Sequence, residues 1–532
     1  MLGADSDCRR CPGRELAPPS ATNGCDSRSA TIPRNPRLCQ GAGVLTDSDL
    51  SAWRDALLAA DYRLDHVLAR IGPGGSSALA RNSTIPVSRA LGDEASDDLL
   101  ALFVLGGALP AERTSRLLGA ALEPLLREGI LRTQGANMRA TVEVRPYGTD
   151  SGLDGWVVAD FTPGLDGRLD VPAADHVLGA SPASTTLAQL TTRDPVGTAL
   201  DLGTGCGIQA LHLAQHCDRV VATDLNPRAL SLTRITAGLN GIAVEIRSGD
   251  LYAPVTDELF DLIVTNPPYV MSPPARAKLT YREAGLSGDE LVHRVVAEGT
   301  ARLAPGGTLQ VLGNWAITDQ DWVERMSGWI EPTGCDALVI ERERLDPGEY
   351  IEIWLADAGL VGTAHYARRY TEWLDYFDAC GIRGVGMGWL NLRNAGRRHP
   401  DVRIESWPHA VAQPVGPAIA AHFAAIGPAG LTDDQLLGAR WRVADHVVQE
   451  AIGRPGAEDP EHLVLRSRSG FARAVEVDTV LAGVVGASDG DLALGQIVNA
   501  LADLLGVDPA AVAGAALPRV RELIRDGFLV LA

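Results

Sequence analysis

Residues 200–207 read Leu200-Asp201-Leu202-Gly203-Thr204-Gly205-Cys206-Gly207, and this glycine-rich turn decides which fold the chain adopts. It follows an apolar segment, residues 198–202, that is typical of a buried strand, and it precedes a helical pattern at residues 208–215. Glycines at such a turn let the backbone bend sharply and approach a ligand without an intervening Cβ. The sequence therefore predicts a ligand-binding strand-to-helix turn.

Short apolar strands alternate with helices on both sides of this turn, over residues 175–345. Alternation of this kind predicts an α/β fold with a doubly wound, largely parallel sheet. Beyond it, the pattern indicates an aromatic-rich helical insertion at residues 347–380, either the core of that insertion or a base-stacking platform. The strands are expected at residues 198–202, 220–223, 244–247, 261–265, 308–312, 338–340, 384–392 and 402–407.

The glycine-rich turn has two possible ligands. A dinucleotide fingerprint has the spacing G-x-G-x-x-G, whereas here the spacing is G-x-G-x-G. In addition, Asp201 opens the turn, and its carboxylate repels a pyrophosphate but attracts an ammonium group. The sequence therefore favours a nucleoside ligand that carries an ammonium group.

Two further strands end in a carboxylate. Asp224 follows the strand at residues 220–223 and can accept both hydroxyls of a ribose, beside Leu225. Asp250 closes the next strand and can accept from the exocyclic amine of adenine, while Leu251 covers the ring. Together with the glycine-rich turn, these strand ends predict an adenosine site.

These residues resemble the motifs of class I S-adenosylmethionine-dependent methyltransferases, over about residues 175–345. The resemblance implies that S-adenosylmethionine is the cofactor. It also places Ser184-Thr185-Thr186-Leu187 where the family has a segment that folds over the methionine end; an N-capped helix at residues 185–190 is the alternative. The implied cofactor-binding residues are Asp201, Gly203, Thr204, Gly205, Gly207, Asp224, Leu225, Asp250, Leu251 and Asn266.

The fourth strand ends in Asn266-Pro267-Pro268-Tyr269, here called the elbow. Two prolines directly after a buried strand force the chain to leave the sheet. The side-chain carbonyl of Asn266 and the backbone carbonyl of Pro267 can both accept hydrogen bonds from one NH2 group, and Tyr269 offers a flat face to a planar amide or nucleobase. We therefore expect the catalytic residues to be Asn266, Pro267, Pro268 and Tyr269.

The elbow resembles that of the amino-methyltransferases, which include the HemK-like glutamine N5-methyltransferases of release factors, adenine N6-methyltransferases and guanine N2-methyltransferases of ribosomal RNA. Residues 281–291 and 303–309 resemble HemK-like segments, although Glu290 stands where that family has glycine. The resemblance implies an N-methyltransferase acting on a glutamine amide of a release factor or ribosomal protein. The alternatives are a nucleobase amino-methyltransferase acting on ribosomal RNA or DNA, and a scaffold that keeps S-adenosylmethionine as a structural ligand.

Mainly helical segments flank this domain. We expect a disordered leader at residues 1–45, an N-terminal domain at 46–150, the methyltransferase domain at 151–408 and a C-terminal domain at 409–532. A helix is expected at residues 46–71. Helices at 97–104, 111–118 and 121–129, with strands at 130–133 and 140–144, favour a winged helix, and helices at 477–485, 493–504 and 517–527 indicate a second. The phrase at residues 125–131 recurs at 523–529.

Composition restricts the partners and the compartment. The formal charge of −20 disfavours a wide contact with bare nucleic acid and favours a protein or ribonucleoprotein substrate. No long apolar run or signal peptide is evident, so we expect a cytoplasmic protein without membrane contact. We expect no metal site; Cys8, Cys11, Cys25 and Cys39 lie in the leader. A basic cluster either contacts phosphates or forms a solvated loop: Arg393, Arg397, Arg398, His399 and Arg403.

Overall fold

A computed structural model describes residues 45–167, 172–273, 288–455 and 460–532. The predicted leader, with its four cysteines, lies outside the described residues except for its last position. Residues 281–287 of the HemK-like segment also lie outside them. The elements described below belong to one compact unit, Arg34–Ala532.

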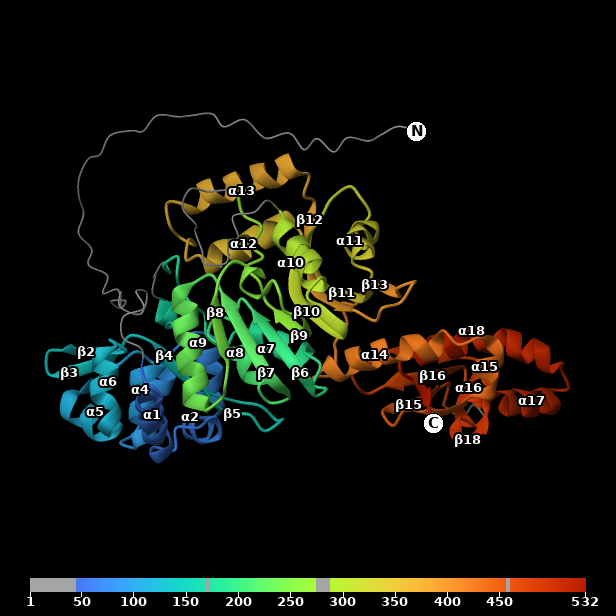
Figure 1. Ribbon diagram of the computed structural model, residues 1–532, viewed down its shortest axis with the longest axis horizontal. Helices are drawn as coiled ribbons and strands as arrows, with labels where there is room; N and C mark the ends of the chain where they lie inside the picture. The colour runs from blue at the N-terminus through green and yellow to red at the C-terminus, as the bar shows by residue number, and fades with distance from the viewer. Residues whose placement is uncertain (1–44, 168–171, 274–287, 456–459) are drawn as a thin grey trace. The chain divides into compact units, whose positions relative to one another are not determined.

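An eight-stranded sheet forms the centre of the protein (Figure 1), with the strand order β13-β11-β12-β10-β9-β6-β7-β8. The first five strands along the chain are parallel, whereas β12 runs antiparallel to both β10 and β11. The predicted doubly wound α/β fold is therefore confirmed. The strands are β6 (Val196–Leu202), β7 (Cys217–Asp224), β8 (Glu245–Ser248), β9 (Phe260–Thr265), β10 (Leu303–Ile317), β11 (Asp336–Leu345), β12 (Gly384–Arg393) and β13 (Val402–Ser406).

Both faces of the sheet are buried, as near-continuous apolar strands require. Because side chains alternate along a strand, Leu200 and Ile263 enter one core, and Ala199 and Leu262 enter another. Helices α10 (Glu290–Thr300) and α11 (Trp322–Ile330) contribute to the first core. The second core receives side chains from α7 (Pro182–Leu190), α8 (Ile208–Leu213) and α14 (Gly416–Ala429).

The aromatic stretch forms two helices, α12 (Pro347–Asp357) and α13 (Tyr366–Cys380). Its large rings form a core of their own with the chain that follows the elbow: Tyr350 and Phe377 are fully buried, and their ring centroids lie 5.8 Å apart. The structure thus supports the helical-insertion interpretation of this stretch over the base-stacking one.

The N-terminal segment begins with α1 (Asp47–Ala59), α2 (Leu64–Ala80) and α3 (Ile85–Ala90). The single helix predicted over residues 46–71 is therefore wrong. The chain turns between α1 and α2, where Asp61 has a φ of 50°, a left-handed conformation that a helix cannot contain. Apolar periodicity continues across this turn, which explains why the sequence pattern suggested one helix.

A helix–strand–helix–helix–hairpin order follows, and its strands form a sheet with the order β1-β3-β2. The predicted strand at residues 140–144 is wrong: β3 ends at Ala140, and β4 (Glu143–Gly148) pairs instead with β5 (Asp154–Ala159). The winged helix stays a prediction that this connectivity accommodates. The other elements are α4 (Ala95–Phe103), β1 (Ala108–Pro110), α5 (Ala111–Leu118), α6 (Leu122–Arg127), β2 (Leu131–Gln134) and β3 (Asn137–Ala140).

The C-terminal segment contains the three predicted helices, although α18 begins eight residues earlier than expected, at Pro509. It has two three-stranded sheets, one of order β15-β16-β17 and one of order β18-β14-β19. The central strand of the second, β14, comes from before the three helices. The repeated phrase ends a helix and begins a strand in both copies. The elements are α15 (Asp433–Gly438), β14 (Arg440–Val443), β15 (Val447–Ile452), β16 (His462–Ser467), β17 (Ala474–Val477), α16 (Thr479–Gly486), β18 (Asp489–Ala493), α17 (Leu494–Leu505), α18 (Pro509–Arg525) and β19 (Leu529–Leu531).

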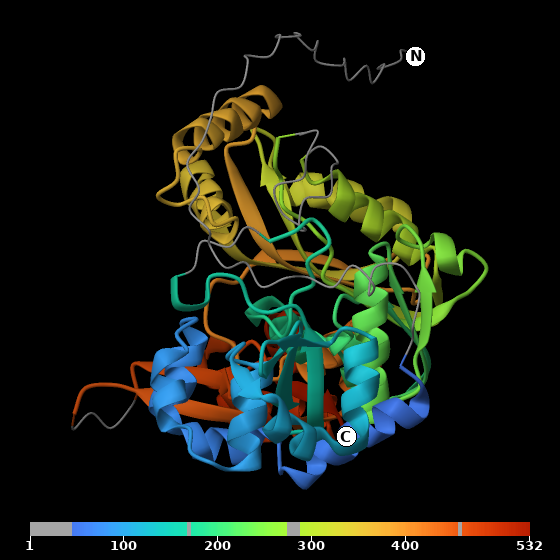
Figure 2. The same cartoon turned by 90° about the vertical axis from the view of Figure 1, so that its left-hand side faces the viewer.

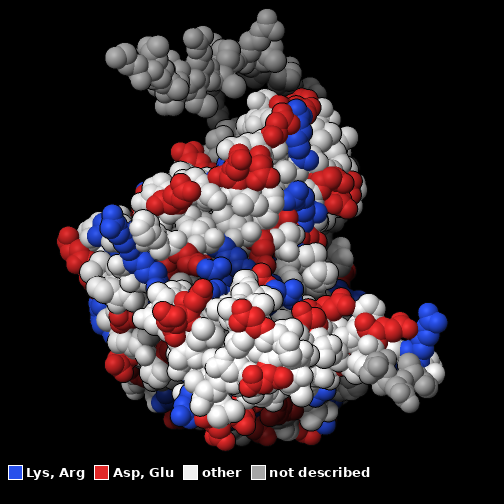
Figure 3. Space-filling view, turned by 90° about the vertical axis from the view of Figure 1, so that its right-hand side faces the viewer, with Lys and Arg blue, Asp and Glu red and all other residues white. Residues whose placement is uncertain are grey.

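Two arginines of the predicted basic cluster are paired with carboxylates. Arg397 Nε donates to Asp336 Oδ2 over 2.8 Å, and Arg403 Nη1 donates to Asp526 Oδ1 over 2.7 Å. On the face shown in Figure 3, basic side chains are interspersed with acidic ones. These pairs weaken the phosphate-binding interpretation, because a paired guanidinium carries no unbalanced charge.

The hairpin β4–β5, here called the N-terminal hairpin, contacts the sheet domain through α9 (Pro227–Asn240), which lies beside β5 (Figure 2). Asn240 at the end of α9 accepts from the backbone of Trp156 and donates back to it, over 3.0 and 2.7 Å. At the start of α9, Arg228 forms an ion pair with Asp160, and both side chains are buried. The division into domains near residues 150 and 408 stays a prediction.

No helix in the described part of the chain is long and apolar enough to cross a membrane. Within the same residues, no group of three or more histidine, cysteine, aspartate or glutamate side chains is placed to hold a metal ion.

Arg228→Met should lower the free energy of unfolding by about 3–5 kcal/mol, because it leaves the Asp160 carboxylate buried without its counter-ion. Urea denaturation measures this loss. Arg234→Met, at an exposed position of the same helix, is the control and should change the free energy by less than about 0.5 kcal/mol. Equal stability of the two variants would show that the buried pair does not support the fold.

Candidate functional site

The carboxyl ends of β6, β7, β8 and β9 open into a cavity of about 600 Å³, at the point where the strand order reverses. Ligands of α/β sheets bind at this position, and the volume lies within the range of small-molecule sites. All but one of the predicted site residues line the cavity: Asp201, Gly203, Thr204, Gly205, Asp224, Leu225, Asp250, Leu251, Asn266, Pro267, Pro268 and Tyr269.

The glycine-rich turn presents bare backbone to the cavity. Gly203 and Gly205 have φ angles of +72° and +59°, and a Cβ added to either would have no atom within 4 Å. Gly207 is the predicted residue that does not line the cavity, and its assignment to cofactor binding stays a prediction. A Cβ at Gly207 would lie 3.1 Å from Thr233 Cγ2, so this glycine lets α8 pack against α9.

Asp201 is buried beneath the turn. Its Oδ2 accepts hydrogen bonds from Thr204 Oγ1 over 2.6 Å and from Ala210 N over 3.0 Å, which fixes the turn to the start of α8. Burial raises the pKa of this carboxyl to about 7. A cationic ligand group in the cavity would favour its ionised form, as the predicted contact with an ammonium group requires.

Asp224 is held in place by backbone donors. Asn226 N donates to its Oδ1 over 2.8 Å, and Gly205 N donates to its Oδ2 over 3.0 Å. Burial raises the pKa of this carboxyl above its ordinary value. Each carboxylate oxygen can accept more than one hydrogen bond, so each can also accept from one hydroxyl of a ribose. Leu225, beside it in the cavity, is 64% exposed and can cover an adenine ring.

Asp250 has a partner that the sequence analysis missed. Arg294 Nη1, on α10, donates to Asp250 Oδ2 over 3.2 Å at the rim of the cavity. The two residues are 44 positions apart, and no local pattern connects them. The next residue, Leu251, has a φ of 43°, which directs its backbone around the cavity wall.

A strap formed by residues 174–181 covers part of the cavity and was also missed. Asn226 Nδ2 donates to the carbonyl of Asp175 over 2.9 Å, and Val177 N donates to Asp160 Oδ2 over 2.9 Å. These two hydrogen bonds connect the strap to the loop after Asp224 and to the residue that follows β5. The strap has no regular secondary structure, so its sequence carried no periodic signal for it.

Ser184 lies in the cavity wall and in the first turn of a helix. It lines the cavity, and its carbonyl accepts from Gln209 Nε2 over 2.7 Å. It also belongs to a helix, but α7 begins at Pro182 and its N-cap is Ser181, three residues before the position that we expected.

The elbow carries a buried acceptor atom. Thr265, the last residue of β9, donates from Oγ1 to the carbonyl of Leu202 over 2.8 Å, which fixes the point where the elbow starts. Next to it, Asn266 Oδ1 is buried, and no described group donates a hydrogen bond to it. A buried carbonyl oxygen without a donor is costly unless a ligand supplies one.

The aromatic insertion contacts the elbow and the residues that follow it. Met271, two residues after Tyr269, donates its N–H to Tyr350 Oη over 3.0 Å and accepts at its carbonyl from Trp373 Nε1 over 2.7 Å. The Tyr269 ring meets the Trp354 ring edge to face, with centroids 6.4 Å apart. The insertion therefore fixes both the backbone after the elbow and the ring that the sequence predicts for the acceptor.

Three families match the chain. Residues 179–331 match the family described as Methyltransferase small domain. Residues 59–141 and 429–531 match two domains of unknown function, DUF7059 and DUF7782. The cavity, the sheet and the first match support a class I S-adenosylmethionine-dependent methyltransferase domain in this part of the chain.

Curated relatives match the same region. The chain is 42% identical over 120 residues to a release factor glutamine methyltransferase of Deinococcus radiodurans and 36% identical over 127 residues to a ribosomal protein uL3 glutamine methyltransferase of Bradyrhizobium diazoefficiens. It is 28% identical over 128 residues to a ribosomal RNA small subunit methyltransferase C of Alcanivorax borkumensis. The matches cover 21%, 21% and 24% of this chain and 43%, 40% and 35% of the relatives.

Solved structures give weaker likenesses. A methyltransferase of Pyrococcus furiosus is 18% identical, with a TM-score of 0.26, covering 42% of this chain and 88% of its own. A 16S rRNA N2 G1207 methyltransferase of T. thermophilus, solved with AdoMet and guanosine, is 18% identical, with a TM-score of 0.26, covering 46% of this chain and 65% of its own.

Asp224→Ala should weaken S-adenosylmethionine binding by about 1–3 kcal/mol, because the ribose hydroxyls lose their charged acceptor. Isothermal titration calorimetry on the purified protein measures this loss. Asp218→Ala, at an exposed position of the same strand, is the matched control and should bind as the wild type does. Unchanged affinity of Asp224→Ala would contradict the ribose assignment.

The affinity for S-adenosylmethionine should rise by up to about tenfold per pH unit between about pH 5.5 and 7, because ionised Asp201 attracts the ammonium group and the protonated form does not. The window follows from its pKa of about 7. Calorimetry at several pH values tests this rise. Asp201→Asn, whose amide oxygen can still accept the two hydrogen bonds, should lose it. A flat affinity for the wild type would exclude the role of Asp201.

Proposed function

We propose that this protein transfers the methyl group of S-adenosylmethionine to a planar NH2 nitrogen, and that the acceptor is a glutamine side-chain amide of a translation-related protein in the cytoplasm. The buried Asn266 Oδ1, to which no group in the described part of the chain donates, carries this proposal, because it offers the cavity an acceptor that an NH2 group satisfies. A release factor and a ribosomal protein are the candidate partners.

The elbow performs the chemistry by positioning. Asn266 Oδ1 and the Pro267 carbonyl accept the two N–H bonds of the acceptor, and the Tyr269 ring packs against its plane. The nitrogen lone pair is then directed away from the elbow and into the cofactor cavity. When bound, S-adenosylmethionine supplies an electrophilic methyl group on a sulfonium. Fixed orientation supplies much of the rate, and the nitrogen can lose its proton to water after transfer.

Charge and similarity favour a protein acceptor. The formal charge of −20 opposes a broad contact with nucleic acid. The relatives of highest identity among those described are named as glutamine methyltransferases. The second candidate is a nucleobase amino group of ribosomal RNA or DNA, with the flanking domains as recognition modules. It is favoured by the relative that is named as a ribosomal RNA methyltransferase.

Methyl-labelled S-adenosylmethionine and an extract of cells that lack this protein distinguish the two candidates. Retained label is counted after treatment with protease, RNase or DNase. Label that only protease removes supports the glutamine amide. Label that a nuclease removes replaces it with the nucleobase, and absence of label overturns the proposed transfer.

Asn266→Ala should reduce the labelling rate at least about a hundredfold while S-adenosylmethionine affinity stays within severalfold, because the lost contact orients the acceptor and not the cofactor. Asn137→Ala, at an exposed position of β3, is the control and should label as the wild type does. Full activity of Asn266→Ala would show that the elbow does not hold the acceptor.

A further inference from the structure

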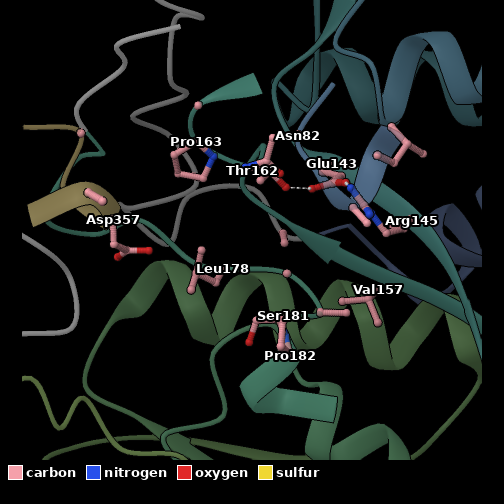
Figure 4. A pocket seen from close by; sticks show the side chains of 18 residues that line it. Asn82, Glu143, Arg145, Val157, Thr162, Pro163, Leu178, Ser181, Pro182 and Asp357 are labelled. Atoms are coloured by element: carbon pink, nitrogen blue, oxygen red, sulfur yellow. Dashed lines mark hydrogen bonds and ion pairs between the residues drawn. The ribbon is translucent and has the colours of Figure 1, made fainter. Parts of the chain in front are cut away.

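A second cavity, of about 470 Å³, lies beside the cofactor cavity (Figure 4). Three parts of the chain form its walls: the hairpin β4–β5 with the end of α2, the strap, and the end of α12. The strap residues Leu178, Gly179 and Ser181 line both cavities. One macromolecule can therefore reach both cavities at once, on either side of the strap.

A buried carboxylate faces the second cavity. Glu143 is 3% exposed; its Oε1 accepts from Arg145 Nε over 2.7 Å, and its Oε2 accepts from Thr162 Oγ1 over 3.2 Å. Figure 4 shows the three side chains together at one wall. A carboxylate has about four lone-pair positions, so Oε2 keeps capacity for a donor from a ligand. The strap passes close by, since a Cβ at Gly179 would lie 3.9 Å from this oxygen.

The charges of the cavity select the class of ligand. Arg145 is the only lysine or arginine among the described residues that line it, and its guanidinium is bound to Glu143. Asp357 adds a second carboxylate to the lining. Among these described residues a phosphate group would thus meet no guanidinium without a carboxylate partner, whereas a group with N–H donors would meet the Glu143 carboxylate as an acceptor. This lining favours a polypeptide over a nucleic acid.

The second cavity also borders the acceptor side of the site. Trp354 on α12 contacts the ring of Tyr269, and Ala356 and Asp357, within one turn of the same helix, line the second cavity. One turn of α12 thus borders both the second cavity and the ring of the elbow, so one bound polypeptide can contact both.

We propose that the second cavity binds a polypeptide substrate at a residue other than the methylated one, and that a side chain ending in N–H donors (arginine, lysine or an amide) donates to Glu143. This inference rests on the proposed methyl transfer. It assigns a part in choosing the substrate to β4, β5 and α12, which lie outside residues 179–331 of the family match.

Filling the cavity tests the proposal. Ala356→Trp and Ala80→Trp place an indole in it from two different segments of its lining, both at exposed positions. Ala379→Trp makes the same change at an exposed position of α13 that does not line the cavity. The acceptor is an extract of cells that lack this protein, and aliquots are treated with protease or nuclease only after the reaction. Labelling rates over a range of extract concentrations give the half-saturating concentration, and calorimetry gives the affinity for S-adenosylmethionine.

Both cavity-filling variants should raise the half-saturating extract concentration at least about tenfold, while their affinity for S-adenosylmethionine stays within twofold of the wild type. Ala379→Trp should match the wild type in both measurements. Unchanged half-saturation in the two variants, or label that resides in nucleic acid, would overturn the substrate-binding role of this cavity while leaving methyl transfer intact. Absence of label with the wild-type protein would overturn the proposed function, and the cavity's role with it.

Discussion

The parallel pairing of Leu202 on β6 with Thr265 on β9 is the constraint on which the site depends. These are the last residues of two neighbouring strands, so the glycine-rich turn and the elbow start side by side at one edge of the sheet. The hydrogen bond from Thr265 to the Leu202 carbonyl fixes the position of the elbow relative to the glycine-rich turn along the strand direction. The main chain thereby brings the proposed cofactor site at the turn and the proposed acceptor site at Asn266 together, and their orientation is left to side chains.

Elements outside the sheet supply that orientation. The ion pair between Asp160 and Arg228 connects the N-terminal hairpin to α9, and the same carboxylate accepts from the strap. On the opposite side, Tyr350 and Trp373 hold the backbone of Met271 after the elbow. The N-terminal hairpin and the aromatic insertion thus support the two halves of one site, and the second cavity lies where these supports meet.

The sequence predicted those parts of the site whose chemistry is local. Such parts are recognisable from the local sequence, as a strand that is followed by glycines, by a carboxylate or by two prolines. The structure places one residue of each kind of strand end, Gly203, Asp224 and Asn266, in one cavity. Gly207 lies outside the lining of that cavity and next to Thr233, and a glycine needed for helix packing has the same local sequence pattern as one that faces a ligand.

Contacts between distant residues could not be predicted. The pairing of Arg294 with Asp250, the strap and the burial of Glu143 all depend on how separate segments pack. The central strand of the C-terminal sheet was missed for the same reason, since β14 precedes the helices that it accompanies. Periodicity locates elements along the chain, but it does not state which elements become neighbours.

The central claim is that the elbow holds an NH2 nitrogen as the methyl acceptor. The most direct test uses S-adenosylmethionine with a ¹³C methyl group and an acceptor extract from cells grown on ¹⁵N, with nuclear magnetic resonance of the methylated product. The account predicts that the transferred methyl signal shows a one-bond ¹³C–¹⁵N coupling. A transferred methyl signal without that coupling would place the methyl group on carbon, oxygen or sulfur and would contradict the account.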